Sequence, residues 1–242
     1  MKAGKLISII IPAYNEERRI KRTICTIIQY LNLHEIPAEI IVVNDGSNDN
    51  TAQILKQLSK EHQNLKCIHL PQNRGKGFAI KEGVLASKGQ FILFSDADLS
   101  TPIQEMDKLI LHLKDGYHIA IGSRRLPESD IKTPQPLHRR LMGRGFAALV
   151  KLLIPGIQDT QCGFKAFRRD AAHLLFSKQR IRRFCFDVEL LYLARRHRLK
   201  IKEVPVCWIN SPHTSVRLLR DPMNMFLDLL RIKLNDILGR YG

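Results

Sequence analysis

Two aspartates, Asp96 and Asp98, directly follow an apolar run at residues 90–95. Carboxylates this close together repel each other, which raises the pKa of one of them unless a cation lies between them. A divalent ion that also binds phosphate oxygens meets this need, and Mg²⁺ and Mn²⁺ prefer such oxygen ligands. The pair therefore indicates a metal–phosphate site. The alternative is a solvated loop in which Asp98 caps the next helix.

Polar clusters also follow two earlier apolar runs. Residues 12–16 read Pro-Ala-Tyr-Asn-Glu, and residues 44–47 read Asn-Asp-Gly-Ser. In an open parallel sheet, ligands bind beyond the carboxyl ends of the strands, so we expect both clusters to lie near Asp96. For Asp45 and its neighbours, plain turn chemistry is the competing interpretation.

A glycine-containing basic segment, Asn-Arg-Gly-Lys-Gly at residues 73–77, precedes a helical pattern. Glycines let backbone approach a ligand closely, and the flanking cations Arg74 and Lys76 favour a phosphate at a helix N-terminus. The Walker spacing is absent, so the segment is not a P-loop. A flexible basic turn is the alternative.

The elements that must position these clusters alternate along the first half of the chain. Strand-like runs span residues 6–11, 39–44, 66–70, 90–95 and 118–122. Helical spacing spans residues 16–33, 50–62, 77–86 and 102–113, with Ser47 or Asp49 as a cap for the second helix and Thr101 for the last. This alternation predicts an α/β fold with a mostly parallel central sheet flanked by helices.

The pattern changes after residue 123. A polar loop is expected at 124–135, helices at 137–153, 184–196 and 221–238, and an edge strand at 201–208. We expect one domain over residues 1–242, with halves at 1–123 and 124–242, and amphipathic helices toward the C-terminus.

Composition narrows the function classes. The 39 Lys and Arg against 23 Asp and Glu give a net charge of +16, which favours polyanionic partners. The five cysteines are scattered without a C-x-x-C pair, which argues against a zinc site or a disulfide framework and favours a cytosolic setting. No stretch approaches the ~18 apolar residues of a spanning helix.

The clusters at residues 12–16, 44–47, 73–77 and 96–98 stand in the order typical of glycosyltransferase family 2, which the chain resembles from about Ile7 to Ile232. Two later motifs, Asp-Thr-Gln-Cys-Gly-Phe-Lys at 159–165 and Phe-Asp-Val-Glu-Leu at 186–190, are similar to its dolichyl-phosphate β-glucosyltransferase branch, a relative of dolichol-phosphate mannose synthase. The resemblance implies a GT-A fold and an inverting, metal-dependent hexose transfer to a polyprenyl or dolichyl phosphate.

The resemblance also implies roles for individual residues. The nucleotide-sugar donor would be bound in residues 1–123, with Asp45 at the base and Arg74 and Lys76 near the base and diphosphate. Asp96 and Asp98 would hold Mg²⁺ or Mn²⁺. The full donor-binding set is Pro12, Ala13, Tyr14, Glu16, Asp45, Arg74, Lys76, Asp96 and Ala97. Asn44 departs from the commoner Asp-Asp-Gly-Ser form. Ser100 stands where mannosyl relatives often carry Gln, which favours UDP-glucose over GDP-mannose.

The acceptor would be handled by residues 124–242. A phosphate monoester is largely dianionic at pH 7, so it needs charge neutralisation more than a general base. Arginines suit such a clamp, and the candidates are Arg124, Arg139, Arg140 and Arg144. Asp159 either orients the acceptor or acts as a base, and it joins Asp98 and Arg124 in the expected catalytic set. Glu189 and His213 are weaker candidates, and Trp208 is expected in the core.

The helices at 137–153 and 221–238 combine apolar and basic residues. Such helices can lie on an anionic membrane surface, here the cytoplasmic membrane face, or contact a separate membrane partner. Packing against the core is the alternative for each helix.

Other function classes have weaker support. A family 2 enzyme that uses GDP-mannose, or a glycan or protein acceptor, stays open. A nucleotidyltransferase would need a Gly-rich start, which residues 12–15 lack. A basic membrane- or nucleic-acid-binding module without catalysis would rest on charge alone. No nucleic-acid-binding signature supports it, and Asp96 with Asp98 argues against it, so we expect no nucleic-acid partner.

Overall fold

The structure is a computed structural model that describes residues 6–133, 137–210 and 220–242. A seven-stranded sheet runs through the molecule in the order β3-β2-β1-β4-β7-β5-β8. Its strand pairs are parallel except those made by β7, which runs antiparallel to β4 and β5. The strands are β1 (Ile7–Ala13), β2 (Ala38–Asn44), β3 (Leu65–His69), β4 (Phe91–Phe94), β5 (Ile119–Ser123), β7 (Lys165–Arg168) and β8 (Ile201–Pro205).

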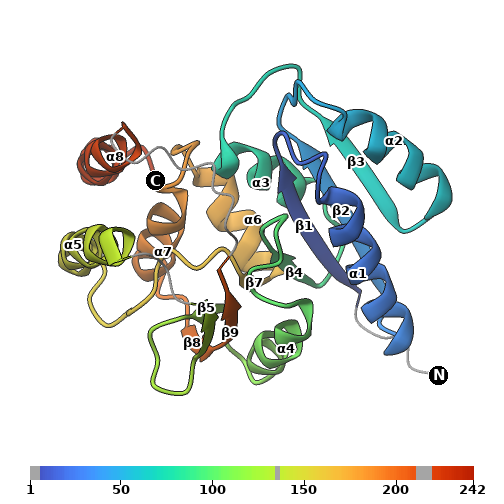
Figure 1. Cartoon of the computed structure of the whole chain (residues 1–242). Helices are drawn as coiled ribbons and strands as arrows, with labels where there is room; N and C mark the ends of the chain where they lie inside the picture. Colours follow the sequence, from blue (N-terminus) through green and yellow to red (C-terminus); the bar gives the residue numbers. More distant parts are fainter. Residues whose placement is uncertain (1–5, 134–136, 211–219) are drawn as a thin grey trace.

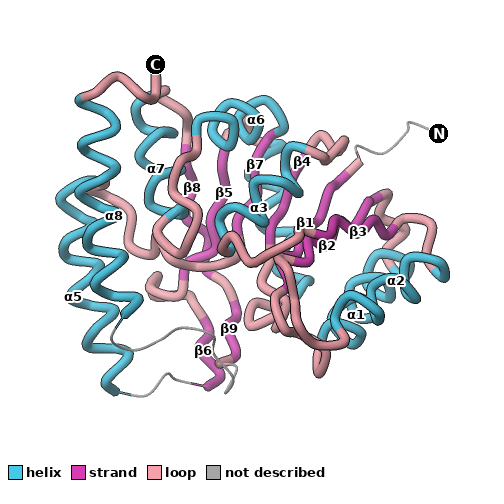
Figure 2. The backbone as a smooth tube through the Cα atoms, turned by 90° about the horizontal axis from the view of Figure 1, so that it is seen from above, coloured by secondary structure: helices cyan, strands magenta, loops and turns pink. Residues whose placement is uncertain are grey.

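Helices cover both faces of the sheet because both faces are apolar. Ile9 and Ile11 of β1 pack with α1, α2 and α4, whereas Ile10 packs against the opposite layer with α3, α6 and α7. The helices are α1 (Ile20–Leu33), α2 (Thr51–Glu61), α3 (Lys76–Leu85), α4 (Met106–Lys114), α5 (Leu137–Leu153), α6 (Arg169–Lys178), α7 (Phe186–Arg196) and α8 (Arg220–Ile237). α5 and α8 lie side by side at one end of the molecule, opposite β3 and α2 (Figures 1 and 2).

The predicted α/β class with a mostly parallel, helix-flanked sheet is confirmed. The first predicted helix was too long, since α1 begins only at Ile20. Residues before it are held by the next loop, because the backbone N–H groups of Glu16 and Glu17 donate to Thr51 Oγ1 and Asp49 Oδ2. The N-cap position of α2 is Asn50, not Ser47 or Asp49, although Asp49 Oδ1 accepts the Thr51 N–H at 2.9 Å.

Several elements differ from the prediction. The helix expected from residue 102 begins as a 3₁₀ turn (Ile103–Glu105) with Pro102, not Thr101, at its N-cap position. The segment expected as a loop at 124–135 contains β6 (Asp130–Thr133). The predicted edge strand is two strands: β8 pairs with β5, and β9 (Cys207–Ile209) pairs with β6 in a small second sheet. β7 and α6 were not predicted.

The topology brings the polar clusters to one edge. β1, β2, β4 and β5 are parallel within the large sheet, so the loops that follow them leave from the same side. The sheet also joins the two halves of the chain, since β7 and β8 come from residues after 123.

Candidate active site

The loops after β1 and β2 are bonded to each other. The Asn15 N–H donates to Ser47 Oγ at 2.9 Å, and the Asn48 N–H donates to Asn15 Oδ1 at 2.9 Å. Asn15 adopts a left-handed backbone with φ 55°, a conformation that Asn tolerates better than most residues. The loops after β1 and β2, separated by about thirty residues in the sequence, therefore form one continuous surface at the edge of the sheet, called the rim below. The exposed Tyr14 ring and the partly buried Pro12 lie beside these contacts.

Asp45 fastens the basic glycine segment to this rim. Its carboxylate accepts the backbone N–H of Arg74 at 2.7 Å and that of Gly75 at 2.8 Å. Burial raises the pKa of this carboxyl, and the two N–H bonds partly offset the effect. The next residue, Gly46, has φ +66°, and a Cβ there would lie 2.4 Å from the Gln72 carbonyl carbon. Asp45 thus fixes the geometry of the segment that carries Arg74 and Lys76.

Asn44, the departure from the commoner motif, closes the same turn. Its Oδ1 accepts the Ser47 N–H at 3.1 Å, and its Nδ2 lies 3.2 Å from His69 Nδ1. The Asn44 side chain is buried, so its amide stabilises the loop after β2 from the protein interior.

The two cations of the glycine segment point to different partners. The Arg74 guanidinium lies over the Phe78 ring, 3.9 Å from its centroid. The Lys76 Nζ lies 2.5 Å from Asp96 Oδ1. Burial lowers the pKa of Lys76, but the carboxylates of Asp96, Asp187 and Asp98 outweigh it and raise the pKa above its usual value. Lys76 therefore stays an ammonium at the predicted metal site.

Asp96 and Asp98 both remain accessible, with side chains 38% and 23% exposed. Asp98 Oδ1 accepts the Ser100 N–H at 2.9 Å, which orients its carboxylate. Ala97 is buried, and its carbonyl accepts the Thr23 hydroxyl. Glu16 lies close enough for both aspartates to raise its pKa, although burial is the larger cause and Arg19 opposes it.

The donor atoms fit a particular kind of metal site. In the described part of the chain, no three His, Cys, Asp or Glu side chains are arranged to hold a metal ion. Two accessible carboxylates suit an ion that keeps water ligands and takes the rest from substrate phosphates, as Mg²⁺ does. Asp96 and Asp98 are the residues that would hold it.

Gly163 is a site residue that the sequence motif contained without revealing its role. A Cβ at this position would lie 2.1 Å from Asp96 Oδ2 and 2.7 Å from its Cγ. The backbone of the 162–163 turn thus packs directly against the Asp96 carboxylate. Only glycine allows this approach, so Gly163 sets the direction in which that carboxylate points.

Arg124 and Asp159 form a bidentate ion pair. Arg124 Nε and Nη2 donate to Asp159 Oδ2 and Oδ1 at 2.7 and 2.9 Å, and the Arg124 N–H donates to Oδ2 at 2.9 Å. The guanidinium also lies 5.5 Å from the Trp208 ring centroid. Burial alone would raise the pKa of Asp159, but Arg124 outweighs it and lowers the pKa to about 2. Such a carboxylate is a poor proton acceptor, so the geometry favours a positioning role over that of a base.

The remaining predicted residues lie away from the site or outside the described residues. Glu189 is fully buried and accepts the Ile181 N–H and the Tyr241 hydroxyl, which makes it part of the core. Trp208 is buried, as expected. Outside the described residues lie His213 and the side chains of Arg139, Arg140 and Arg144.

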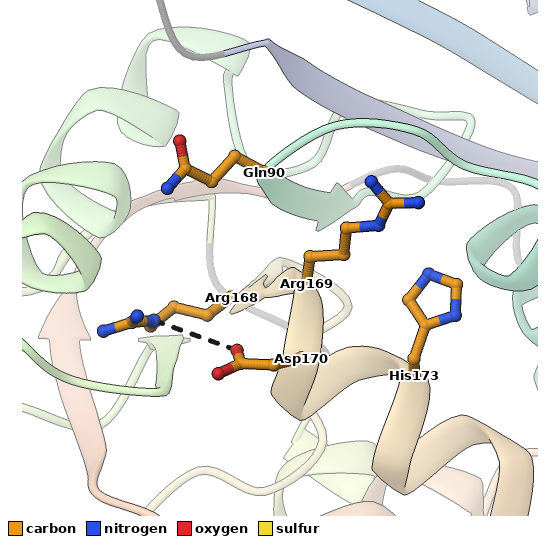
Figure 3. A pocket seen from close by; sticks show the side chains of 5 residues that line it. All are labelled: Gln90, Arg168, Arg169, Asp170 and His173. Carbon is orange, nitrogen blue, oxygen red and sulfur yellow. Dashed lines mark ion pairs between the residues drawn. The ribbon is translucent and has the colours of Figure 1, made fainter.

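A shallow pocket lies at the opposite end of the strands (Figure 3). Gln90 directly precedes β4 and Arg168 ends β7, so this hollow is at the other edge of the sheet from Asp96. Arg169, Asp170 and His173 of α6 complete its lining. It belongs to none of the clusters that the sequence identified.

The mostly parallel, helix-flanked sheet has the GT-A fold, as the comparison with a solved structure shows. The glucosyl-3-phosphoglycerate synthase of Mycobacterium tuberculosis, solved with Mn²⁺, uridine-diphosphate-glucose and phosphoglyceric acid, superposes with a TM-score of 0.69. It is 21% identical, and the match covers 100% of this chain and 81% of that one.

The model of glycosyl transferase family 2 matches residues 8–176. Two dolichyl-phosphate beta-glucosyltransferases are similar over almost the whole chain. That of Trichomonas vaginalis is 39% identical over 93% of this chain and 72% of its own length. That of Homo sapiens is 36% identical over 98% of this chain and 78% of its own length. The chain belongs to glycosyl transferase family 2, which confirms the predicted enzyme class.

Proposed function

We propose that this enzyme transfers glucose from UDP-glucose to a polyprenyl or dolichyl phosphate and forms a β-linked lipid-phosphate sugar. The observation that carries the proposal is the meeting of Lys76 and Arg124 around Asp96. Lys76 contacts Asp96 at 2.5 Å, and Arg124 pairs with Asp159 in the segment whose Gly163 packs against Asp96. Two anionic substrates, a diphosphate and a phosphate monoester, require such a concentration of cations at one point. The dolichyl-phosphate enzymes named above supply the acceptor class.

The chemistry follows from the charges. An oxygen of the lipid phosphate attacks the anomeric carbon of glucose in line with the bond to UDP. That bond breaks, and its electron pair leaves on the β-phosphate of UDP. A phosphate dianion carries no proton to remove, so no general base is needed. An α-linked donor thus gives a β-linked product.

The residues divide the work of neutralising charge. Lys76 binds the donor diphosphate, and Arg124, held in place by Asp159, binds the acceptor phosphate. Pro12, Tyr14 and Asp45 line the nucleoside. A divalent ion held by Asp96 and Asp98 would supply Lewis-acid stabilisation of the departing diphosphate.

Transfer of labelled sugar tests the proposal. Purified protein is given polyprenyl phosphate with UDP-glucose or GDP-mannose, with Mg²⁺, Mn²⁺ or a chelator. We expect label in the lipid phase with UDP-glucose and a metal ion only. Lipid label from GDP-mannose alone would overturn the donor assignment. Protein that binds UDP but labels no lipid would move the acceptor to a glycan or a protein.

A lipid acceptor also requires a membrane surface, and we assign this role to α8 with the end of α5. Both helices expose large apolar side chains: Leu152 is 82% exposed, Leu230 55% and Ile237 80%. Basic residues flank them, among them Lys151, Lys233 and Arg240. Two copies paired through this face would bring like charges together, whereas an anionic lipid surface would neutralise them. Among the described residues, no helix has the length and apolar character needed to cross a bilayer.

Vesicle flotation tests this assignment. We expect the protein to float with anionic vesicles at low salt and to remain at the bottom with neutral ones. Leu230→Glu should abolish flotation, whereas Leu111→Glu, at a position 57% exposed on α4, should leave it unchanged. Wild-type protein that does not float with anionic vesicles would contradict the assignment and favour a separate membrane partner. The cytoplasmic face of the membrane is the location that this proposal implies.

A further inference from the structure

A buried ion pair lies beneath the metal site and is not used by the reaction described above. Lys165 of β7 is 0% exposed, and its Nζ lies 2.5 Å from Asp187 Oδ1 at the start of α7. The same ammonium donates to the Cys162 carbonyl at 2.5 Å, and it lies 5.4 Å from the Phe94 ring centroid. Burying two charges is costly, so the fold keeps both only with close partners.

Lys76 links this pair to the surface. Its ammonium contacts Asp96 Oδ1. The next residue, Gly77, packs against Phe186, whose Cβ would lie 2.6 Å from a Cβ at Gly77, so the negative charge of the adjacent Asp187 also acts on Lys76. In turn, Asp187 is subject to the charges of Lys165 and Lys76. Charges thus alternate in sign from the core to the site: Lys165, Asp187, Lys76, Asp96. Lys76 therefore contacts one accessible carboxylate, Asp96, and is also attracted by the buried carboxylate of Asp187.

The accessible Asp96 carboxylate lies between Gly163 and Lys76. Asp96 Oδ2 faces Gly163, where even a Cβ would lie only 2.1 Å away. The other oxygen, Oδ1, is the one that Lys76 contacts. A divalent ion bound at Asp96 would lie beside this ammonium, and the two positive charges would repel each other. Lys76 and the metal ion therefore compete for Asp96.

We propose that Lys76 is an internal competitor for the metal site, and that the donor diphosphate relieves the competition by drawing the ammonium away from Asp96. Asp187, fixed by Lys165, is the positioning residue that attracts Lys76 toward the protein interior and so weakens its hold on Asp96. Metal and donor then bind cooperatively, and each raises the affinity for the other by the same factor. This inference rests on the metal–donor site of the proposed function, but not on the identity of the acceptor.

Mn²⁺ binding tests the inference without any turnover. Free Mn²⁺ is measured by electron paramagnetic resonance during titration of the full chain, with and without UDP. We expect UDP to tighten Mn²⁺ binding to the wild type. Lys76→Met, which removes the competitor, should bind Mn²⁺ alone at least ~10-fold more tightly than the wild type and respond less to UDP. Lys108→Met removes a surface lysine paired with Glu105 and should bind Mn²⁺ like the wild type.

Asp187→Asn provides the second readout. Without the buried carboxylate, Lys76 is held by Asp96 more firmly, so donor-free Mn²⁺ affinity should fall. In the Lys76→Met background, the same substitution should lower Mn²⁺ affinity by a smaller factor, because only the direct loss of the buried negative charge remains. A merely structural role predicts an equal loss in both backgrounds, and that result would overturn the role of Asp187. Denaturant titration establishes that each variant is folded, and Lys76→Met decides the central point even if Asp187→Asn does not fold.

The outcomes separate this inference from the proposed function. Lys76→Met that binds Mn²⁺ no more tightly than the wild type overturns the competition. If Lys76→Met binds Mn²⁺ more tightly than the wild type, but the wild type transfers no glucose to lipid, the competition is supported and the acceptor assignment fails. No Mn²⁺ binding by any variant, even with UDP, overturns both the inference and the metal site.

Discussion

Replacing Gly163 with Ala adds one methyl group at the most crowded point of the proposed metal site. The new Cβ would lie 2.1 Å from Asp96 Oδ2, whereas ordinary van der Waals contact begins at 3.4 Å. The carboxylate must therefore move by about 1.3 Å, the difference between these distances. Gly163 is not among the glycines with positive φ, so alanine fits the backbone itself.

The expected cost is functional. Asp96 is partly exposed and can rotate away from the methyl group, so the free energy of unfolding should change by less than ~1 kcal/mol. A reacting group misplaced by about 1 Å can lose ~100-fold in rate, and we expect a loss of that size in sugar transfer. Mn²⁺ affinity in the presence of UDP should fall in parallel.

The assay compares initial rates of metal-dependent transfer with midpoints of urea unfolding. The matched control is Gly145→Ala in α5, where a Cβ meets nothing within 4 Å. Alanine in this helix should raise stability slightly and leave UDP-dependent Mn²⁺ binding unchanged. A Gly163→Ala variant with near wild-type transfer and Mn²⁺ affinity would refute the role given to this contact.

Three further substitutions test other parts of the site. Gly46→Ala should lower the free energy of unfolding in urea by roughly 3 kcal/mol, and Gly239→Ala by only about 1 kcal/mol. Both glycines have positive φ, but only Gly46 lacks space for a Cβ. Equal losses in the two variants would contradict the tight turn at Gly46. Asp159→Asn should lower the free energy of unfolding by about 3 kcal/mol, because it leaves Arg124 without its buried counter-charge. Replacing both Arg124 and Asp159 by Leu should lower it by less. A double variant less stable than the single one would contradict this prediction. Asp98→Ala should lower transfer at least ~1,000-fold with an unchanged unfolding midpoint, and a near wild-type rate would remove Asp98 from the site.

The first half of the fold could be predicted from sequence because its signals are local. β1, β2 and β4 are short, mostly apolar runs buried on both faces, and polar residues follow each of them. Parallel topology then brings those ends together, which is why Asp45, Asp96 and the 73–77 segment were singled out together. Their detailed contacts, such as the Asp45 carboxylate on the backbone of residues 74 and 75, depend on loop geometry that the residue types do not specify.

The second half was harder because its decisive contacts are not local. β7 has only four residues and includes Lys165, whose buried charge interrupts the apolar pattern expected of a strand. It inserts between β4 and β5, which are adjacent to it only in space. Arg124 and Asp159 were each selected from sequence, but their pairing across 35 positions depends on the fold of the second half. Gly163 lies within a motif selected from sequence, but its role could not be predicted, because it depends on the close approach of Asp96 in the folded structure.

The stereochemistry and destination of the transferred sugar show directly whether a lipid phosphate attacks the donor in line. The protein is incubated with polyprenyl phosphate, Mn²⁺ and UDP-glucose carrying ¹³C at the anomeric carbon of its α-linked sugar. Nuclear magnetic resonance then follows that carbon. In-line attack by the lipid phosphate predicts that the label appears in the lipid phase as a β-linked glucosyl phosphate. An α-linked lipid product would contradict in-line attack, and label released only as free glucose would contradict a lipid phosphate acceptor.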